Sequence, residues 1–145
     1  MARVQVKKLD ERAILPTHGS QAAAGWDLYA CLDADAEIAP HETKLLHTGL
    51  AVALPEGTFG AVFARSGLAA KEGLRPANCV GVCDSDYRGE YVVALHNDGD
   101  APRTVQPGER IAQLVLLPFL PMEFEETDAL SDTARGAGGF GSTGK

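Results

Sequence analysis

Alternation of apolar and polar residues with a period of two most constrains how this chain folds. Four stretches show it: VQVKKL from Val4, TFGAVFA from Thr58, EYVVALHN from Glu90 and ERIAQLVLLP from Glu109. This period matches strands with one buried face, whereas an amphipathic helix repeats about every 3.6 residues. The one helical candidate is the short segment 68–74, with Gly73 as its stop. The sequence therefore predicts an all-β protein.

Glycine and proline punctuation supports a compact β architecture. The 145 residues include 16 glycines and 8 prolines, with turn signals at Pro55–Gly57, Asn97–Gly99 and Pro107–Gly108. Short strands with regular turns are typical of a sandwich, a jelly roll or a barrel. The length suits one domain. We expect a single β domain with a connecting arm over residues 1–134, followed by a separate segment over residues 135–145.

Charge and cysteine content narrow the class of protein. The net charge of -7 and the pI near 5.0 argue against a nucleic-acid partner, which would need a basic face. Cys31, Cys79 and Cys83 are odd in number and lack the spacing of a zinc or redox pair, which fits a reducing cytosol. No stretch is apolar enough for a signal peptide or a membrane span. We expect a soluble, cytoplasmic protein without a membrane partner.

The last eleven residues, RGAGGFGSTGK, form a glycine-rich segment that no packed core could use. Arg135 offers a fork of donors for phosphate, Phe140 a flat face for a ring, and Ser142 and Thr143 hydroxyl groups. Glycine allows positive φ or a close approach to a ligand, at an entropy cost that a bound ligand offsets. The glycines concerned are Gly136, Gly138, Gly139, Gly141 and Gly144. The segment is either a flexible terminus or a lid over a nucleotide.

The preceding segment, MEFEETDALSDTA after Pro121, loses the alternation and gathers acidic residues. It contains Met122, Phe124 and Leu130 but little of its own chain on which they could pack. We expect an arm that leaves the core and contacts a neighbouring subunit.

The segment Asn78–Leu95 is predicted to be a hairpin in which DYRG closes the turn and Gly89 takes the left-handed position. Asp84 and Asp86 are turn formers in the simplest interpretation. Asp84, however, follows the run 80–83, which looks buried, and a carboxylate at such a position is unexpected unless it has a specific role. A carboxylate at the mouth of a pocket can hold and deprotonate water. Asp84 is therefore the candidate general base.

Polar groups in three other motifs could contact phosphate or metal. Arg65, Ser66 and Gly67 follow an apolar strand, either as a phosphate cradle or as a surface turn with a salt-bridged arginine. Asp27 is either a structural acid or one that orients water around Mg²⁺. Gln113 interrupts a buried strand and needs a partner, because an unpaired buried amide costs a few kcal/mol. The backbone of its own subunit is the default partner.

Five motifs, AAGWDLYA, ARSGLA, NCVGVCDSDYRG, PGERIAQLV and RGAGGFGSTG, resemble in order and type those of trimeric deoxyuridine triphosphatase, the dUTPase family. The resemblance runs from about Ala23 to the C-terminus. Trp26 and Ala64 stand where the family often has other residues, and Cys83 replaces a common isoleucine. The resemblance implies a jelly-roll-like β-clip fold, a homotrimer with sites shared between subunits, and a flexible glycine-rich C-terminal arm.

The implied reaction is hydrolysis of dUTP to dUMP and pyrophosphate, which limits uracil incorporation into DNA and supplies dUMP for dTMP synthesis. Asp84 would be the general base for a water that attacks the α-phosphorus. Mg²⁺ would be chelated by the triphosphate, with Asp27 acting only through its water shell. The implied phosphate contacts are Arg65, Ser66 and Gly67, with Gln113 assisting.

The resemblance also implies how the nucleoside is bound. Tyr87 would pack on the deoxyribose and exclude a 2′-hydroxyl group. Asn78 and the main chain around Val82, Cys83 and Val92 would pair with uracil. From the arm, Arg135 would close over the γ-phosphate and Phe140 would stack on uracil beside Gly141.

Three rival interpretations make different predictions. A dCTP deaminase-like trimer would need a glutamate to activate water and would release ammonia, whereas this segment carries Asp84 and keeps the phenylalanine arm. A non-catalytic nucleotide-binding module would bind dUTP without forming product. An acidic β domain with a floppy tail would be unaffected by removal of residues 135–145.

Overall fold

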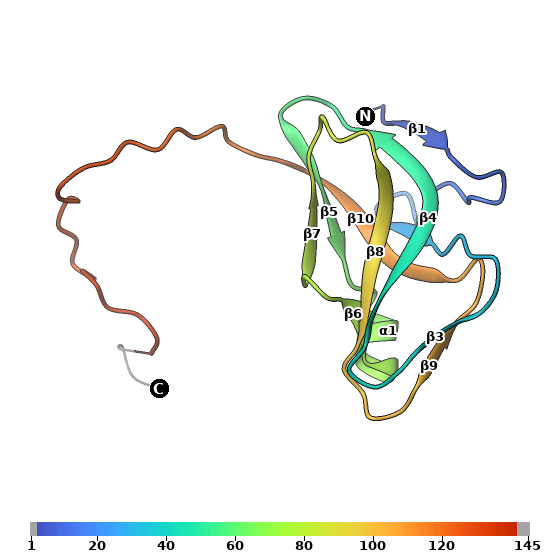
Figure 1. Cartoon of the computed structure of the whole chain (residues 1–145). Coiled ribbons are helices and arrows are strands. Elements are labelled where there is room, and N and C mark those ends of the chain that lie inside the picture. Colours follow the sequence, from blue (N-terminus) through green and yellow to red (C-terminus); the bar gives the residue numbers. More distant parts are fainter. Residues whose placement is uncertain (1–2, 142–145) are drawn as a thin grey trace.

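The computed structural model describes residues 3–141 and has two four-stranded antiparallel sheets with a small third sheet (Figure 1). The first sheet has the order β1 (Gln5–Lys8), β4 (Thr43–Ala53), β8 (Glu90–Asn97), β6 (Leu74–Pro76). The second has the order β2 (Trp26–Tyr29), β10 (Arg110–Pro118), β5 (Thr58–Phe63), β7 (Val80–Cys83). The third pairs β3 (Ala36–Ile38) with β9 (Arg103–Val105). The predicted all-β fold is confirmed.

The core lies between the inner faces of the sheets, as the period-two alternation requires. Along β8 the side chains alternate, so that Tyr91, Val93 and Leu95 are buried and the residues between them are less so. Each fully buried aliphatic side chain contributes about 1.5–3 kcal/mol. Core residues no more than 1% exposed include Leu28, Ile38, Leu46, Leu95 and Ile111.

A β-bulge interrupts the pairing of the long strand β4 with β8. The register moves from His47 opposite Val92 to Ala51 opposite Glu90. Gly49 lies in this bulge with a φ of 67°, and a Cβ atom there would stand 2.8 Å from the Cβ of Ala13. Only glycine fits this backbone without strain.

The predicted hairpin over Asn78–Leu95 is wrong. Strand β7 pairs with β5, whereas β8 pairs with β4 and β6, so residues 84–89 cross from one sheet to the other. Gly89 is not left-handed. A Cβ atom there would lie 2.3 Å from the Tyr87 hydroxyl oxygen, so glycine leaves room for the tyrosine ring. Two alternating runs around a turn signal fit a hairpin and a sheet-to-sheet crossing equally well.

The helix lies two residues earlier than the predicted segment 68–74. Helix α1 spans Ser66–Glu72, and Leu74 already belongs to β6. Gly73 ends the helix as predicted, with a φ of 71° and its N–H donated to the Leu68 carbonyl. Ser66 and Gly67 therefore form the first turn of a helix rather than a surface turn.

Beyond β10 the chain leaves the body as an arm, as predicted (Figure 1). Residues 119–141 contain no strand, and Met122, Phe124 and Leu130 are each at least 80% exposed. The neighbouring subunit expected to cover them stays a prediction. Within residues 3–141, no helix has the length and hydropathy needed to cross a membrane.

Asn97 provides a test of how the loops are fixed to the core. Its buried side-chain amide donates to the carbonyls of Ile38, Ala39 and Ala101 and accepts the N–H of Gly99. Replacing Asn97 by alanine leaves these buried backbone groups without a hydrogen-bond partner. We therefore expect the free energy of unfolding to fall by about 2–4 kcal/mol.

Urea denaturation at one protein concentration measures this loss. The exposed change Thr104→Ala on β9 is the control, with an expected effect within about 0.5 kcal/mol. An equal effect of the two changes would contradict the role assigned to Asn97.

Candidate functional site

A cavity of about 310 Å³ lies where residues 84–89 cross between the two sheets. It gathers six of the predicted site residues: Asn78, Val82, Cys83, Asp84, Tyr87 and Val92. Other lining residues, including Leu28, Val62, Glu90 and Tyr91, were not among the predictions. The sheet crossing thus creates the pocket that a hairpin would not have formed.

Asp84 stands at the exposed end of β7, beside Tyr87. Its carbonyl accepts the Tyr87 N–H at 3.2 Å, whereas its carboxylate forms no hydrogen bond or ion pair with the part of the chain that the structure describes. The Tyr87 hydroxyl donates to the Glu90 carbonyl at 3.0 Å. An ionised carboxylate that no protein group occupies can accept a hydrogen bond from water.

The strand before Asp84 is more exposed than its apolar sequence indicated. Val80 is 38% exposed and Val82 is 65% exposed, so the expectation of a buried run was wrong. The reason is that, within residues 3–141, β7 pairs with β5 alone and forms the edge of its sheet. Main-chain groups on the outer side of an edge strand are available to other partners.

Cys83 and Tyr91 form an apolar wall of the pocket. Burial raises the pKa of the Cys83 thiol and that of the Tyr91 phenol, so both stay neutral near pH 7. The Tyr91 hydroxyl lies beside the thiol but has no hydrogen bond of normal geometry within residues 3–141. The Tyr87 and Tyr91 rings lie 6.1 Å apart between centroids.

A second polar cluster joins β2, β10 and the start of α1. Asp27 accepts from Arg65 Nε at 2.8 Å and from Arg110 Nη1 at 3.3 Å. Gln113 donates to the Ala64 carbonyl at 2.8 Å, which confirms its default backbone partner. A Cβ atom on Gly25 would come within 2.3 Å of the Gln113 side-chain oxygen, so this glycine leaves room for the amide.

Within this cluster, Asp27 and Arg65 form an ion pair with each other. Their side chains are only 18% and 26% exposed, respectively, so the pair is partly shielded from water. The salt-bridged arginine considered from the sequence is therefore present, immediately before helix α1. Ser66 is exposed, and a Cβ atom on Gly67 would meet nothing within 4 Å, which leaves the space in front of the helix start open.

The two clusters do not meet within one chain. Cys83 pairs with Gly60, so Asp84 comes level with Phe59 on β5. Arg65 lies six residues further along, and at a rise of about 3.3 Å per residue this places it roughly 20 Å from Asp84. One chain alone therefore does not bring Arg65, Ser66 and Asp84 around one small ligand.

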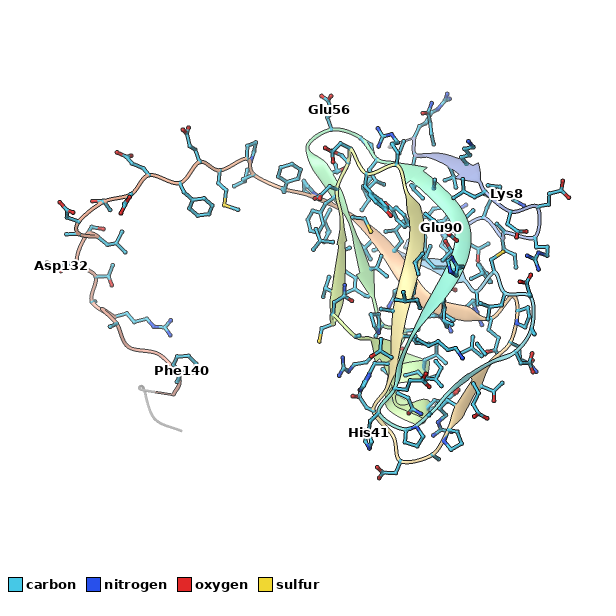
Figure 2. All side chains as sticks on the ribbon, in the orientation of Figure 1. Lys8, His41, Glu56, Glu90, Asp132 and Phe140 are labelled. Atoms are coloured by element: carbon cyan, nitrogen blue, oxygen red, sulfur yellow. The ribbon has the colours of Figure 1, made fainter. Side chains whose placement is uncertain are left out.

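The arm residues predicted to bind nucleotide lie away from both clusters. Figure 2 shows Phe140 on the arm, apart from the body, and its side chain is fully exposed. Arg135 Nε donates to the Gly138 carbonyl at 2.8 Å within the arm itself. Positive φ occurs at Gly136 and Gly141 but not at Gly138 and Gly139. Ser142, Thr143 and Gly144 lie outside the described residues.

The described residues provide no direct metal cage. Among residues 3–141, no three His, Cys, Asp or Glu side chains are grouped so that they could hold an ion. Both oxygens of Asp27 already accept from arginine. These donors do not fit direct Mg²⁺ coordination, although Mg²⁺ in proteins commonly keeps its waters and binds substrate phosphates.

Comparison with known proteins decides the family. The dUTPase family model matches residues 11–144. The chain belongs to the dUTPase family. A deoxyuridine 5'-triphosphate nucleotidohydrolase of Desulfitobacterium hafniense is 50% identical over 143 residues, covering 98% of this chain and 95% of its own. One of Acinetobacter baumannii is 46% identical over 148 residues, covering 99% of both.

Solved dUTPase structures share the fold. A Staphylococcus bacteriophage 80alpha dUTPase with dUPNHPP matches with a TM-score of 0.90 and 28% identity, covering 99% of both chains. A second structure of the 80alpha dUTPase matches with a TM-score of 0.81 and 25% identity, covering 90% of this chain and 99% of its own. These matches confirm the predicted dUTPase resemblance and fold.

Cysteine reactivity tests the description of this dUTPase pocket. Cys79 is exposed, with Arg75 Nη1 at 3.7 Å from its sulfur, whereas burial raises the pKa of Cys31 and of Cys83. Because the thiolate is the reactive form, we expect iodoacetamide at pH 8 to modify Cys79 several-fold faster than the other two. Peptide mass spectrometry over time gives the three rates. Equal rates for Cys79 and Cys83 would contradict the buried pocket wall.

Proposed function

We propose that this protein hydrolyses dUTP to dUMP and pyrophosphate, with Asp84 as the general base. The observation that carries the proposal is one pocket that holds Tyr87, the exposed edge of β7 and a carboxylate, Asp84, that has no partner among residues 3–141. The dUTPase family match and the names of the relatives support the reaction. In the cell, this activity limits uracil in DNA and supplies dUMP.

Asp84 is proposed to hold a water molecule and take its proton as the water oxygen attacks the α-phosphorus. The bond from that phosphorus to its bridging oxygen breaks, and pyrophosphate leaves. A positioned general base contributes about a hundredfold to ten-thousandfold in rate. The exposed Asp84 carboxylate suits this role because, in the described part of the chain, it need not first release a partner.

The pocket is proposed to bind the deoxyuridine part. The outer edge of β7 offers main-chain donors and acceptors near Val82 and Cys83, with Asn78 at its start and Val92 on the facing strand. Such an edge can bind a base through paired hydrogen bonds, and the narrow walls exclude a base with a larger substituent by steric clash. Tyr87 packs on the sugar and excludes a 2′-hydroxyl group.

Arg65, Ser66 and Gly67 are proposed to bind the phosphates, with Gln113 holding this region in place. The Asp27 carboxylate fixes Arg65, and the open space before α1 leaves the backbone N–H groups of its first turn accessible. Mg²⁺ would arrive on the triphosphate, with Asp27 next to its water shell. When bound, the ion stabilises negative charge that develops on the phosphoryl oxygens.

We further propose a homotrimer in which different chains complete each site. The separation of roughly 20 Å between Asp84 and Arg65 along the sheet supports this sharing, because a triphosphate chain contacted at both ends needs them closer. The exposed apolar arm supports it too, and residues 135–145 act as a lid whose Arg135, Phe140 and Gly141 reach the nucleotide. Three free cysteines fit a cytoplasmic protein.

A substrate panel tests the reaction. With Mg²⁺, we expect pyrophosphate from dUTP, far less from dTTP, UTP or dCTP, and no ammonia from dCTP. Asp84→Asn keeps the shape but removes the base, so turnover should fall by about a hundredfold or more while dUTP binding persists. Ammonia release would support a dCTP deaminase-like enzyme. Tight dUTP binding by the unmodified protein without product would support a non-catalytic module.

Mixing inactive variants tests the shared site. Asp84→Ala and Arg135→Ala each remove one contribution, so mixed trimers contain sites with an intact base from one chain and an intact arm from another. We expect part of the dUTPase activity to return after subunit exchange. The control mixes Asp84→Ala with the double variant Asp84→Ala, Arg135→Ala, which should stay inactive. No recovery in verified mixed trimers would contradict the proposed sharing.

A further inference from the structure

Glu90 connects two sides of the protein through different atoms. It is the first residue of β8, on the body near β4 (Figure 2). It lines the nucleotide pocket and also a second cavity of about 330 Å³. The partners of its carboxylate, His47 and Gly49, line only the second cavity, whereas the partner of its carbonyl, Tyr87, lines only the first. The carboxylate therefore acts from outside the pocket.

The carboxylate fixes Glu90 to the β4 bulge through both oxygens. Oε1 accepts the Gly49 N–H at 2.8 Å, and Oε2 lies 2.9 Å from His47 Nδ1, which donates to it. The Glu90 side chain is only 24% exposed. Pairing through both oxygens restrains a side chain more than one bond does, because two directions are fixed. Residue 90 is thus held in place against the bulge.

The same residue holds the tyrosine that faces the sugar. The Glu90 carbonyl accepts the Tyr87 hydroxyl at 3.0 Å, and the Tyr87 ring lies over Gly89, where any side chain would displace it. Tyr87 itself is 45% exposed, so packing covers only part of its side chain. Its position depends on where the Glu90 carbonyl stands.

We propose that Glu90 is a positioning residue that sets the selectivity for deoxyribose by holding Tyr87 in place. The inference rests on the proposed hydrolysis of dUTP and on Tyr87 as the residue that excludes a 2′-hydroxyl group. Steric exclusion of one oxygen atom requires a ring fixed to a fraction of an ångström, because a loose ring moves aside. Glu90 provides that restraint through the bulge of β4.

The readout is the ratio of kcat/KM for dUTP to kcat/KM for UTP. Glu90→Ala removes both hydrogen bonds of the carboxylate and should lower this ratio about tenfold. Glu90→Gln keeps an oxygen for the Gly49 N–H and should retain most of the ratio. His47→Ala, at a mostly exposed side chain, removes one of the two bonds and should lower the ratio less.

The matched control is Glu42→Ala. The Glu42 carboxylate also accepts a backbone N–H, that of Ala39 at 2.7 Å, and Glu42 does not line the pocket. It should leave the ratio unchanged although it too removes a carboxylate bonded to backbone. An unchanged ratio in Glu90→Ala, or an equal fall in Glu42→Ala, would overturn the proposal.

A double variant shows whether Glu90 acts through Tyr87. Tyr87→Phe removes the hydroxyl bonded to the Glu90 carbonyl, so adding Glu90→Ala should then change the ratio little. If the ratio in the double variant falls by the product of the two single fold-changes, Glu90 does not act through Tyr87 and the proposal is contradicted. NMR of the nucleotide-free protein adds a readout without turnover, since the Tyr87 ring signals should shift in Glu90→Ala but not in Glu42→Ala. Hydrolysis of dUTP by the unmodified protein separately decides the proposed function.

Discussion

The crossing of residues 84–89 from one sheet to the other is the constraint on which the rest of the structure depends. It keeps β7 and β8 apart, so that a cavity opens where a hairpin would have closed. It also leaves Asp84 at the end of an edge strand, where its carboxylate has no partner among the residues that the structure describes. Tyr87 lies within the crossing and is fixed at both ends, by the Asp84 carbonyl and by the Glu90 carbonyl.

The parts of the fold predicted from sequence were those determined by local pattern. Strands β5, β8 and β10 follow from period-two alternation, and the end of α1 follows from Gly73. The long strand β4 gave no clear signal, because Gly49 and its bulge interrupt the alternation. Which strands pair is a non-local property, and for this reason the hairpin was wrong although both of its strands exist.

The site was predicted in part for the same reason. Six of the predicted site residues meet in one pocket, but Tyr91 and Glu90 were missed because each looks like an ordinary member of an alternating strand. Gly25 gave no signal in the sequence, and Gly89 was assigned to a left-handed turn rather than to the space that the Tyr87 ring fills. The ion pair of Asp27 with Arg65 spans 38 residues, a distance at which sequence pattern carries no information.

The exposed edge of β7 also creates a risk of aggregation. Its unpaired main-chain groups and the exposed side chains of Val80 and Val82 form a template on which a strand from any chain could add. The strand has only four residues, which limits how firmly a stray partner could hold. The edge proposed to bind the base is thus also a surface on which aggregation can begin.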